Sequence, residues 1–186
     1  MPKKPCPPVK GDADQTTISA GLLRIFGVGA LILGDSGIGK SESALELISR
    51  GHKFIADDVV RIRKTTGGRL FGTAPALSRN FMEIRGLGII NIREIFGAQM
   101  GSRGAKGDLI IRLKKWRRGF EVDRLGLKVG NDECILGLRV PQVAIPVAPG
   151  RNIATLIEVA CKVHLLRTRG YHAPQEIIRR LDRALA

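Results

Sequence analysis

The sequence has few aromatic residues, few cysteines and no long apolar run. Among its 186 residues are six Phe, one Tyr and one Trp, too few for the aromatic platforms on which proteins stack nucleic-acid bases. Its cysteines, Cys6, Cys134 and Cys161, form no close pair. That spacing indicates neither a disulfide framework nor a CxxC metal site, and it favours a reducing compartment. No apolar run reaches the roughly 18 residues of a membrane span, and no secretory signal pattern opens the chain. We therefore expect a cytoplasmic protein that is not associated with a membrane.

Acidic residues are also scarce beside the basic ones. The chain holds 31 Lys and Arg against 17 Asp and Glu, a net charge of +14. A field of that sign attracts anions such as nucleotides, inorganic phosphate, acidic proteins or nucleic acid. The basic residues are spread along the chain, with modest clusters at 114–118 and 179–183, which is typical of a solvated surface. Because only the charge favours it, nucleic-acid binding is the weakest of the functions considered.

The chain is long enough for one ordinary domain. Residues 1–15 contain four prolines, several charges and few large apolar groups, so we expect a flexible lead-in or linker there. Residues 16–186 should form the folded domain.

The apolar pattern predicts an α/β fold with a mixed sheet and helices packed against it. Two strands are expected at 22–26 and 30–33 around a turn at 27–29, and the second is apolar throughout, as in a strand buried on both faces. A helix over 40–50 and a strand over 53–56 follow. Shorter strands are expected around 61–64, 89–92, 109–113 and 143–147. Two helices close the chain, one capped by Asn152 and one with Pro174 in its first turn.

One segment matches the phosphate-binding pattern G-x-x-x-x-G-K-[ST] in full. Its glycines let the backbone approach phosphate oxygens with N–H groups pointing inward, and the following helix adds the positive end of its dipole. The lysine supplies a full charge toward the β- and γ-phosphates, and the serine hydroxyl can ligate Mg²⁺. The segment consists of Gly34, Asp35, Ser36, Gly37, Ile38, Gly39, Lys40 and Ser41.

Two further segments carry candidate chemistry. Asp57 and Asp58 end an apolar strand soon after the P-loop helix, and phosphoryl transfer needs one carboxylate to take a proton and others to hold Mg²⁺. Glu83 is a candidate metal ligand, and Arg85 could stabilise charge on a transferring phosphoryl group. For the last two, an ordinary salt-bridged turn is an equally good interpretation.

Beyond these generic features, the sequence resembles the catalytic domain of HPr kinase/phosphorylase, which modifies a serine of the phosphocarrier protein HPr. The resemblance covers about residues 17 to 185, in the right order. It is carried by 34–47, 50–52, 56–58, 82–91, 123–126, 145–147, 149–152, 157–160 and 170–171.

The resemblance implies a bifunctional enzyme that phosphorylates HPr with ATP and Mg²⁺ and reverses this by phosphorolysis. The reverse reaction consumes inorganic phosphate and releases pyrophosphate. It further implies a P-loop core like that of phosphoenolpyruvate carboxykinase, assembled as hexamers. By residue, the resemblance implies that Asp58 acts as the base in the forward reaction and as the acid in the reverse reaction, and that Lys40 holds phosphate. It implies that Ser41 and Glu83 bind Mg²⁺ and that Arg124 assists the chemistry. The Pro146–Arg151 loop would serve mainly the reverse reaction.

The chain departs from the family pattern at three points. Ser19 aligns with a family histidine, Ala148 stands where an Arg or Lys is usual, and the family's N-terminal domain is missing from this sequence. Two alternatives therefore stay open. One is a related P-loop kinase acting on another protein or on a small molecule such as free serine. The other is a nucleotide-binding regulatory module with little turnover.

Overall fold

A computed structural model describes Cys6 and residues 14–116 and 132–185. Its strands are β1 (Gln15–Ser19), β2 (Gly21–Ile25), β3 (Val28–Leu33), β4 (Lys53–Ala56), β5 (Val59–Lys64), β6 (Leu70–Thr73), β7 (Phe81–Ile84), β8 (Gly88–Asn91), β9 (Ala105–Lys106), β10 (Leu109–Lys115), β11 (Glu133–Ile135), β12 (Leu138–Val140) and β13 (Gln142–Val147). Its helices are α1 (Lys40–Ser49), α2 (Ile92–Phe96), the 3₁₀ turn Ala98–Met100, α3 (Ile153–Thr168) and α4 (Ala173–Leu185).

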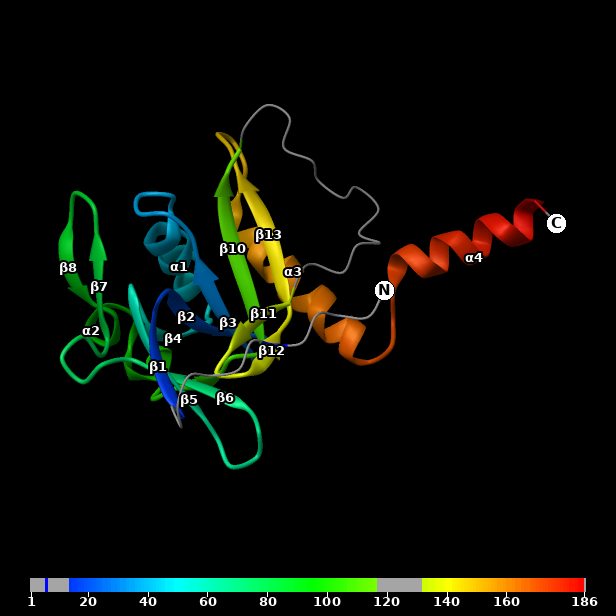
Figure 1. Cartoon of the computed structure of the whole chain (residues 1–186). Helices are drawn as coiled ribbons and strands as arrows, with labels where there is room; N and C mark the ends of the chain where they lie inside the picture. Colours follow the sequence, from blue (N-terminus) through cyan, green and yellow to red (C-terminus); the bar gives the residue numbers. More distant parts are fainter. Residues whose placement is uncertain (1–5, 7–13, 117–131, 186) are drawn as a thin grey trace.

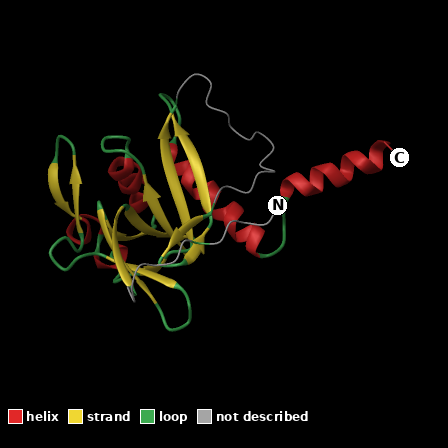
Figure 2. Cartoon of the chain, in the orientation of Figure 1, coloured by secondary structure: helices red, strands yellow, loops and turns green. Residues whose placement is uncertain are grey.

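The strands form two stacked sheets and two separate hairpins (Figures 1 and 2). The central sheet has the order β13-β10-β3-β2-β4, and the second has the order β1-β5-β6-β9. β3, β10 and β13 run parallel, whereas β2 is antiparallel to both β3 and β4. The predicted mixed sheet with α/β architecture is thereby confirmed.

The core lies on both faces of the central sheet. On one face, Ala30 and Ile32 of β3 pack with residues of α1 and α3. On the other face, Leu31 packs with residues of the second sheet. Because neighbouring residues of a strand point to opposite faces, a strand covered on both sides must be apolar at every position. The prediction that this strand is buried on both faces is confirmed.

This topology brings the carboxyl-terminal ends of four strands to the same side of the central sheet. The parallel strands β3, β10 and β13 end there, and β4 ends there too because two antiparallel pairings relate it to β3. In open α/β sheets, ligands bind at the carboxyl ends of the strands. The segments that follow β3 and β4 are the P-loop and Asp57–Asp58. The predicted 146–151 loop begins within β13, because Pro146 and Val147 are its last two residues, and only residues 148–151 follow the strand.

The turn between the first two strands of this sheet is tighter than predicted. Ile25 pairs with Val28, which leaves Phe26 and Gly27 as a two-residue turn with both residues at positive φ. Such turns match the twist of a hairpin. Gly29 instead belongs to β3, where a Cβ would lie 1.6 Å from the Lys106 carbonyl oxygen. Glycine is needed at position 29 because two backbone segments approach closely there, and not because of turn geometry.

Two cysteines that lie far apart in sequence form a disulfide, which corrects our expectation of none. Cys6 and Cys134 are 128 residues apart, yet their Cα atoms lie 5.6 Å from each other. Sequence spacing could not indicate this pair because the fold alone brings the two segments together. Because this disulfide is present, the cysteine spacing no longer favours a reducing compartment. Of the expected lead-in, only Cys6, Asp14 and Gln15 are described, and Cys6 is tied to β11.

The two C-terminal helices are confirmed, but only the first packs on the sheet. α3 is capped by Asn152, whose side chain accepts a hydrogen bond from Thr155 N, and it buries Ile157 and Cys161. α4 extends away from the body of the molecule (Figure 1) and buries no residue. Its apolar residues Ile177, Ile178, Leu181 and Leu185 are exposed. Within the described residues, no helix combines the length and apolar character needed to cross a membrane.

Candidate functional site

The predicted P-loop connects β3 to α1 at the carboxyl edge of the sheet. Gly39 caps α1 with a φ of +99°, and Gly37 has a φ of +73°. L-residues with a side chain seldom adopt these angles, so glycine is needed at both positions. The loop lies between a strand buried on both faces and an amphipathic helix, which is the structural context that phosphate-binding loops require. The first turn of α1 leaves backbone N–H groups free to bind an anion.

Lys40 is held against its own loop. Its side chain is only 8% exposed, and Nζ donates to the carbonyl oxygens of Gly34 at 3.0 Å and Asp35 at 3.1 Å. An ammonium group has three N–H donors, so these two bonds leave one for an incoming anion. Lys40 also lines the pocket described below. It is therefore a preorganised positive charge and not a mobile surface lysine.

The two adjacent carboxylates have different surroundings. Asp57 is 8% exposed and its Oδ2 accepts a hydrogen bond from Ser41 Oγ at 3.1 Å, while its Oδ1 is buried and has no hydrogen-bond partner among the described residues. Burial, followed by the charge of Asp58, raises the pKa of Asp57 to about 6, although the bond from Ser41 opposes the shift. Asp58 is exposed and adopts a φ of +60°. The pair thus combines a buried carboxyl group behind Ser41 with an exposed carboxyl group at the open surface.

A pocket of about 130 Å³ joins the P-loop to the β7–β8 hairpin. The hairpin contributes Glu83 and Arg85, and Arg85 passes close to Gly37, where an added Cβ would lie 3.4 Å from its Nη2. Residues of the P-loop, the first turn of α1 and Asp58 complete the wall. The lining residues are Ser36, Gly37, Gly39, Lys40, Ser41, Glu42, Asp58, Glu83 and Arg85.

Most of the predicted site residues converge on this pocket. Asp57 lies behind it through its bond to Ser41, while Gly34, Asp35 and Ile38 belong to the loop without lining the cavity. Arg151 donates through Nη1 to the Pro146 carbonyl oxygen at 2.8 Å, at the same edge of the sheet. Arg124 lies outside the described residues, as does the 123–126 segment.

Sequence reasoning missed one member of the pocket and one neighbour of the carboxylates. Glu42 lines the pocket from the first turn of α1; its place directly after Ser41 was the available signal. Ser19 pairs with Val59, and Ala20 N donates to the Asp58 carbonyl oxygen at 3.1 Å. Ser19, where the resemblance implies a histidine in the family, therefore lies next to the carboxylate pair in space and carries a hydroxyl.

The raised pKa of Asp57 predicts a pH-dependent stability. A folded-state pKa of about 6, above the ordinary 3.8, means that the folded protein binds this proton more tightly than the unfolded chain. The stabilisation is complete below about pH 4 and is lost as the pH rises through 6. Asp57→Asn cannot ionise, so its stability relative to wild type should rise by roughly 3 kcal/mol between pH 4 and 8. Denaturant unfolding across this range measures the difference.

Asp108→Asn is the control for this experiment. The Asp108 carboxylate accepts a hydrogen bond from Gly29 N at 2.9 Å and lies outside the pocket, so its replacement controls for the loss of one negative charge and one hydrogen-bond acceptor. A difference between Asp57→Asn and wild type that stays constant from pH 4 to 8 would contradict the prediction.

Comparison with known proteins identifies the family of this chain. Residues 12–181 match the family model for the HPr Serine kinase C-terminal domain. An HPr kinase/phosphorylase from Caldanaerobacter subterraneus subsp. tengcongensis is 45% identical over 171 residues, covering 91% of this chain and 55% of that protein. One from Lachnoclostridium phytofermentans is 44% identical over 173 residues, covering 93% and 56%. The chain therefore spans about half the length of the curated relatives it matches.

A solved structure shows the same fold. The Hpr(Ser) kinase/phosphatase from Coxiella burnetii superposes with a TM-score of 0.78 at 34% identity, covering 87% of this chain and 98% of that one. The sequence match, the shared fold and the arrangement of the P-loop lead to one conclusion: this chain belongs to the HPr serine kinase C-terminal domain family.

Proposed function

We propose that this protein phosphorylates a serine of the phosphocarrier protein HPr with ATP and Mg²⁺, and reverses this by phosphorolysis. One observation carries the proposal: Lys40 and Ser41 of the P-loop share a pocket with Asp58 and Glu83. Phosphate-binding, metal-binding and proton-transferring groups are thereby gathered around one small volume. The relatives are named HPr kinase/phosphorylase or Hpr(Ser) kinase/phosphatase, and these names support the choice of reaction and acceptor.

The residues fit a nucleotide with its metal ion. The backbone N–H groups at the start of α1 and the Lys40 ammonium would hold the β- and γ-phosphates. Mg²⁺ prefers oxygen ligands and is usually held by one or two carboxylates together with phosphates and waters. The Ser41 hydroxyl and the Glu83 carboxylate supply such oxygens, and the buried Asp57 Oδ1 without a partner lies behind Ser41. When bound, the ion neutralises charge that develops on the transferred group.

No cluster of three or more His, Cys, Asp and Glu side chains suited to a metal occurs among the described residues. That result fits a site whose remaining ligands come from the nucleotide and from water. A cage built entirely from protein side chains is the arrangement of other metal classes.

We assign the transfer of the seryl hydroxyl proton to the Asp57–Asp58 pair. Asp58 lines the pocket, and its charge contributes to the raised pKa of the adjacent Asp57. In the forward direction, the seryl oxygen bonds to the γ-phosphorus, the bond to ADP breaks, and the seryl proton passes to Asp58. In reverse, an oxygen of inorganic phosphate bonds to the same phosphorus, and the proton returns to the departing seryl oxygen. The products are then pyrophosphate and free HPr.

The remaining assignments follow the resemblance. Arg85, beside Gly37 in the pocket, and Arg124 are proposed to stabilise the charge of the transferring phosphoryl group. The loop from Pro146 to Arg151 is proposed to serve mainly the phosphate-consuming direction. We further propose that the domain has a core like that of phosphoenolpyruvate carboxykinase, forms hexamers and acts in the cytoplasm.

The direct test is intact-mass analysis of purified HPr incubated with this protein, ATP and Mg²⁺, followed by added inorganic phosphate. We expect a gain of one phosphoryl group on serine and then its loss, with release of pyrophosphate. A gain without loss would show a kinase that lacks phosphorolysis. No gain despite ATP binding would overturn HPr as the acceptor. That outcome would favour another substrate or a regulatory module, to which Ser19 beside the carboxylate pair also points.

A further inference from the structure

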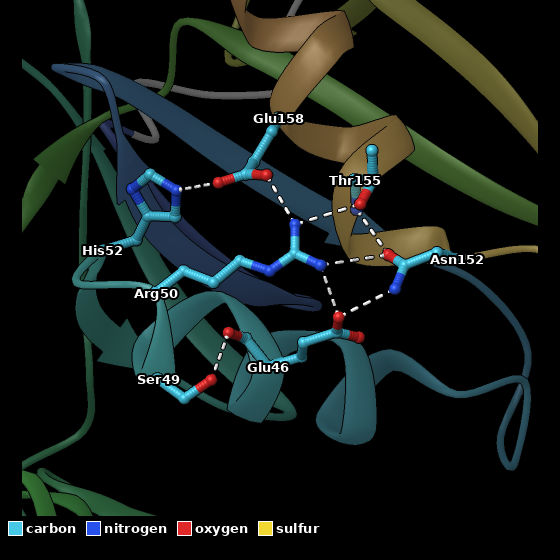
Figure 3. A network of polar contacts seen from close by, with 7 residues as sticks. All are labelled: Glu46, Ser49, Arg50, His52, Asn152, Thr155 and Glu158. Atoms are coloured by element: carbon cyan, nitrogen blue, oxygen red, sulfur yellow. Dashed lines mark hydrogen bonds and ion pairs between the residues drawn. The ribbon is translucent and has the colours of Figure 1, made fainter.

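Three segments that carry the family resemblance lie outside the pocket, yet they meet one another. They are 50–52 after α1, 149–152 before α3, and 157–160 within α3. Figure 3 shows their polar side chains joined in one network between α1 and α3. We call this network the interhelix clamp, and it consists of Glu46, Arg50, His52, Asn152, Thr155 and Glu158.

Arg50 is the centre of the clamp. Its Nη1 donates to Glu158 Oε2 at 2.6 Å and to Thr155 Oγ1 at 3.0 Å, both on α3. Its Nη2 donates to Glu46 Oε1 at 2.5 Å, on its own helix. Nη2 also donates to Asn152 Oδ1 at 3.4 Å, at the start of α3. The planar guanidinium thus binds both helices through two nitrogens at once, a geometry that a single ammonium group cannot reproduce.

The α3 side of the clamp is partly buried. The Glu158 side chain is 18% exposed, and its Oε1 lies 2.7 Å from His52 Nε2. Burial pushes the pKa of Glu158 upward, but the hydrogen bonds from His52 and Arg50 outweigh it and leave the pKa below its usual value. Glu158 is therefore held as a carboxylate. Charge-assisted bonds of this kind are stronger than those of an exposed ion pair.

Asn152 joins the clamp to the 146–151 loop. Its Nδ2 donates to Glu46 Oε1 at 2.8 Å, and its Oδ1 accepts from Thr155 N at 2.7 Å as the cap of α3. Arg151, the residue before it, is bound to the carbonyl oxygen of Pro146 at the other end of the loop. Asn152, the residue that follows the loop, is thus bound to α1. The first turn of the same helix carries Lys40 and Ser41.

From this geometry we infer that the clamp sets the position of the 146–151 loop relative to the P-loop, and that Arg50 is a positioning residue for the phosphate-consuming direction. Arg50 touches neither the pocket nor the reacting atoms. It acts through Glu46 and Asn152, which fix the end of the loop to the helix that carries the phosphate-binding residues. The link to phosphorolysis rests on the proposed function, whereas the link to loop position rests on the contacts alone.

The test compares Arg50→Met, Arg50→Lys and Arg112→Met in the full chain. Arg112 also links two elements, through Glu133 and Gln142, but it lies on the opposite face of the central sheet. It therefore controls for general loss of stability. Two quantities are measured: amide hydrogen exchange over 147–152 and over 34–41, and the rates of HPr phosphorylation and of its phosphate-dependent reversal.

In Arg50→Met we expect faster exchange over 147–152 without a matching change over 34–41. The reverse rate should fall by roughly tenfold or more, because small displacements of positioning groups have large kinetic effects. The forward rate should fall by less than about threefold. Arg50→Lys should recover only part of the reverse rate, and Arg112→Met should leave the ratio of the two rates unchanged.

Unchanged exchange over 147–152 in Arg50→Met would overturn the clamp itself. Faster exchange with an unchanged ratio of rates would overturn its role in the reverse reaction. If the wild-type protein neither phosphorylates HPr nor reverses the reaction, the proposed function fails, and the exchange measurement still decides whether the clamp holds the loop.

Discussion

Lys40→Ala is expected to abolish phosphoryl transfer in both directions, with a loss of about a thousandfold or more. The side chain supplies the one full positive charge that the P-loop directs at the phosphates, and it is held in place by two carbonyl oxygens of its own loop. A preorganised charge of this kind stabilises the transition state without the cost of rearrangement during the reaction. Steady-state rates with HPr, ATP and Mg²⁺ measure the forward loss, and pyrophosphate release measures the reverse loss.

Lys53→Ala is the matched control for this variant. Lys53 also donates to a backbone carbonyl oxygen, that of Gln99 at 2.7 Å, but it does not line the pocket. Its replacement should leave turnover within about threefold of wild type. Thermal unfolding of both variants separates loss of chemistry from loss of fold. Normal turnover in Lys40→Ala would contradict the proposed role of the P-loop.

Asp58→Asn is expected to suppress both directions by a factor of about a hundred or more while leaving nucleotide affinity nearly unchanged. The amide cannot take up the seryl proton, and by microscopic reversibility it cannot return it. Asn is also well suited to the backbone here, because Asp58 has a φ of +60° and Asn tolerates this region better than most residues. A folding defect is therefore not expected. Forward and reverse rates, together with ATP binding by calorimetry, test the prediction.

Asp57→Asn and Asp108→Asn complete the comparison. Asp108 accepts a hydrogen bond from Gly29 N away from the pocket, and its variant should remain active once stability is taken into account. If Asp57→Asn loses both directions while Asp58→Asn keeps them, the proton belongs to Asp57 and our assignment of Asp58 is wrong. Loss of a single direction in Asp58→Asn would contradict a shared acid and base.

Local patterns predicted a large part of this fold. The strand apolar at every position became β3, the glycine-rich segment became the P-loop, and Asn152 caps α3 as expected. Each of these signals depends on residues close together in the chain, such as a side-chain period or a capping bond. The short strands β1, β6, β7, β9, β11 and β12 were not predicted, because strands of two to five residues depend on partners distant in sequence.

The candidate site shows the same division. Lys40, Ser41 and the carboxylate pair could be selected from the sequence because a complete motif and an apolar strand preceded them. For Glu83 and Arg85, a functional role and a simple turn were equally good interpretations. The β7–β8 hairpin brings both residues to the pocket wall, which favours the functional interpretation that we propose. Glu42 follows Ser41 directly but lies outside the phosphate-binding pattern, so the motif did not select it.

The sequence by itself determined the phosphate-binding loop, the strand buried on both faces and the resemblance to the family, because these depend on the order and spacing of neighbouring residues. Tertiary structure alone decided the Cys6–Cys134 disulfide, the meeting of Arg50 with Glu158, and the exposure of the apolar side of α4. In each of these cases the partner, or its absence, is set by how sheets and helices pack. Residues 100 or more positions apart become neighbours only when the whole chain has folded.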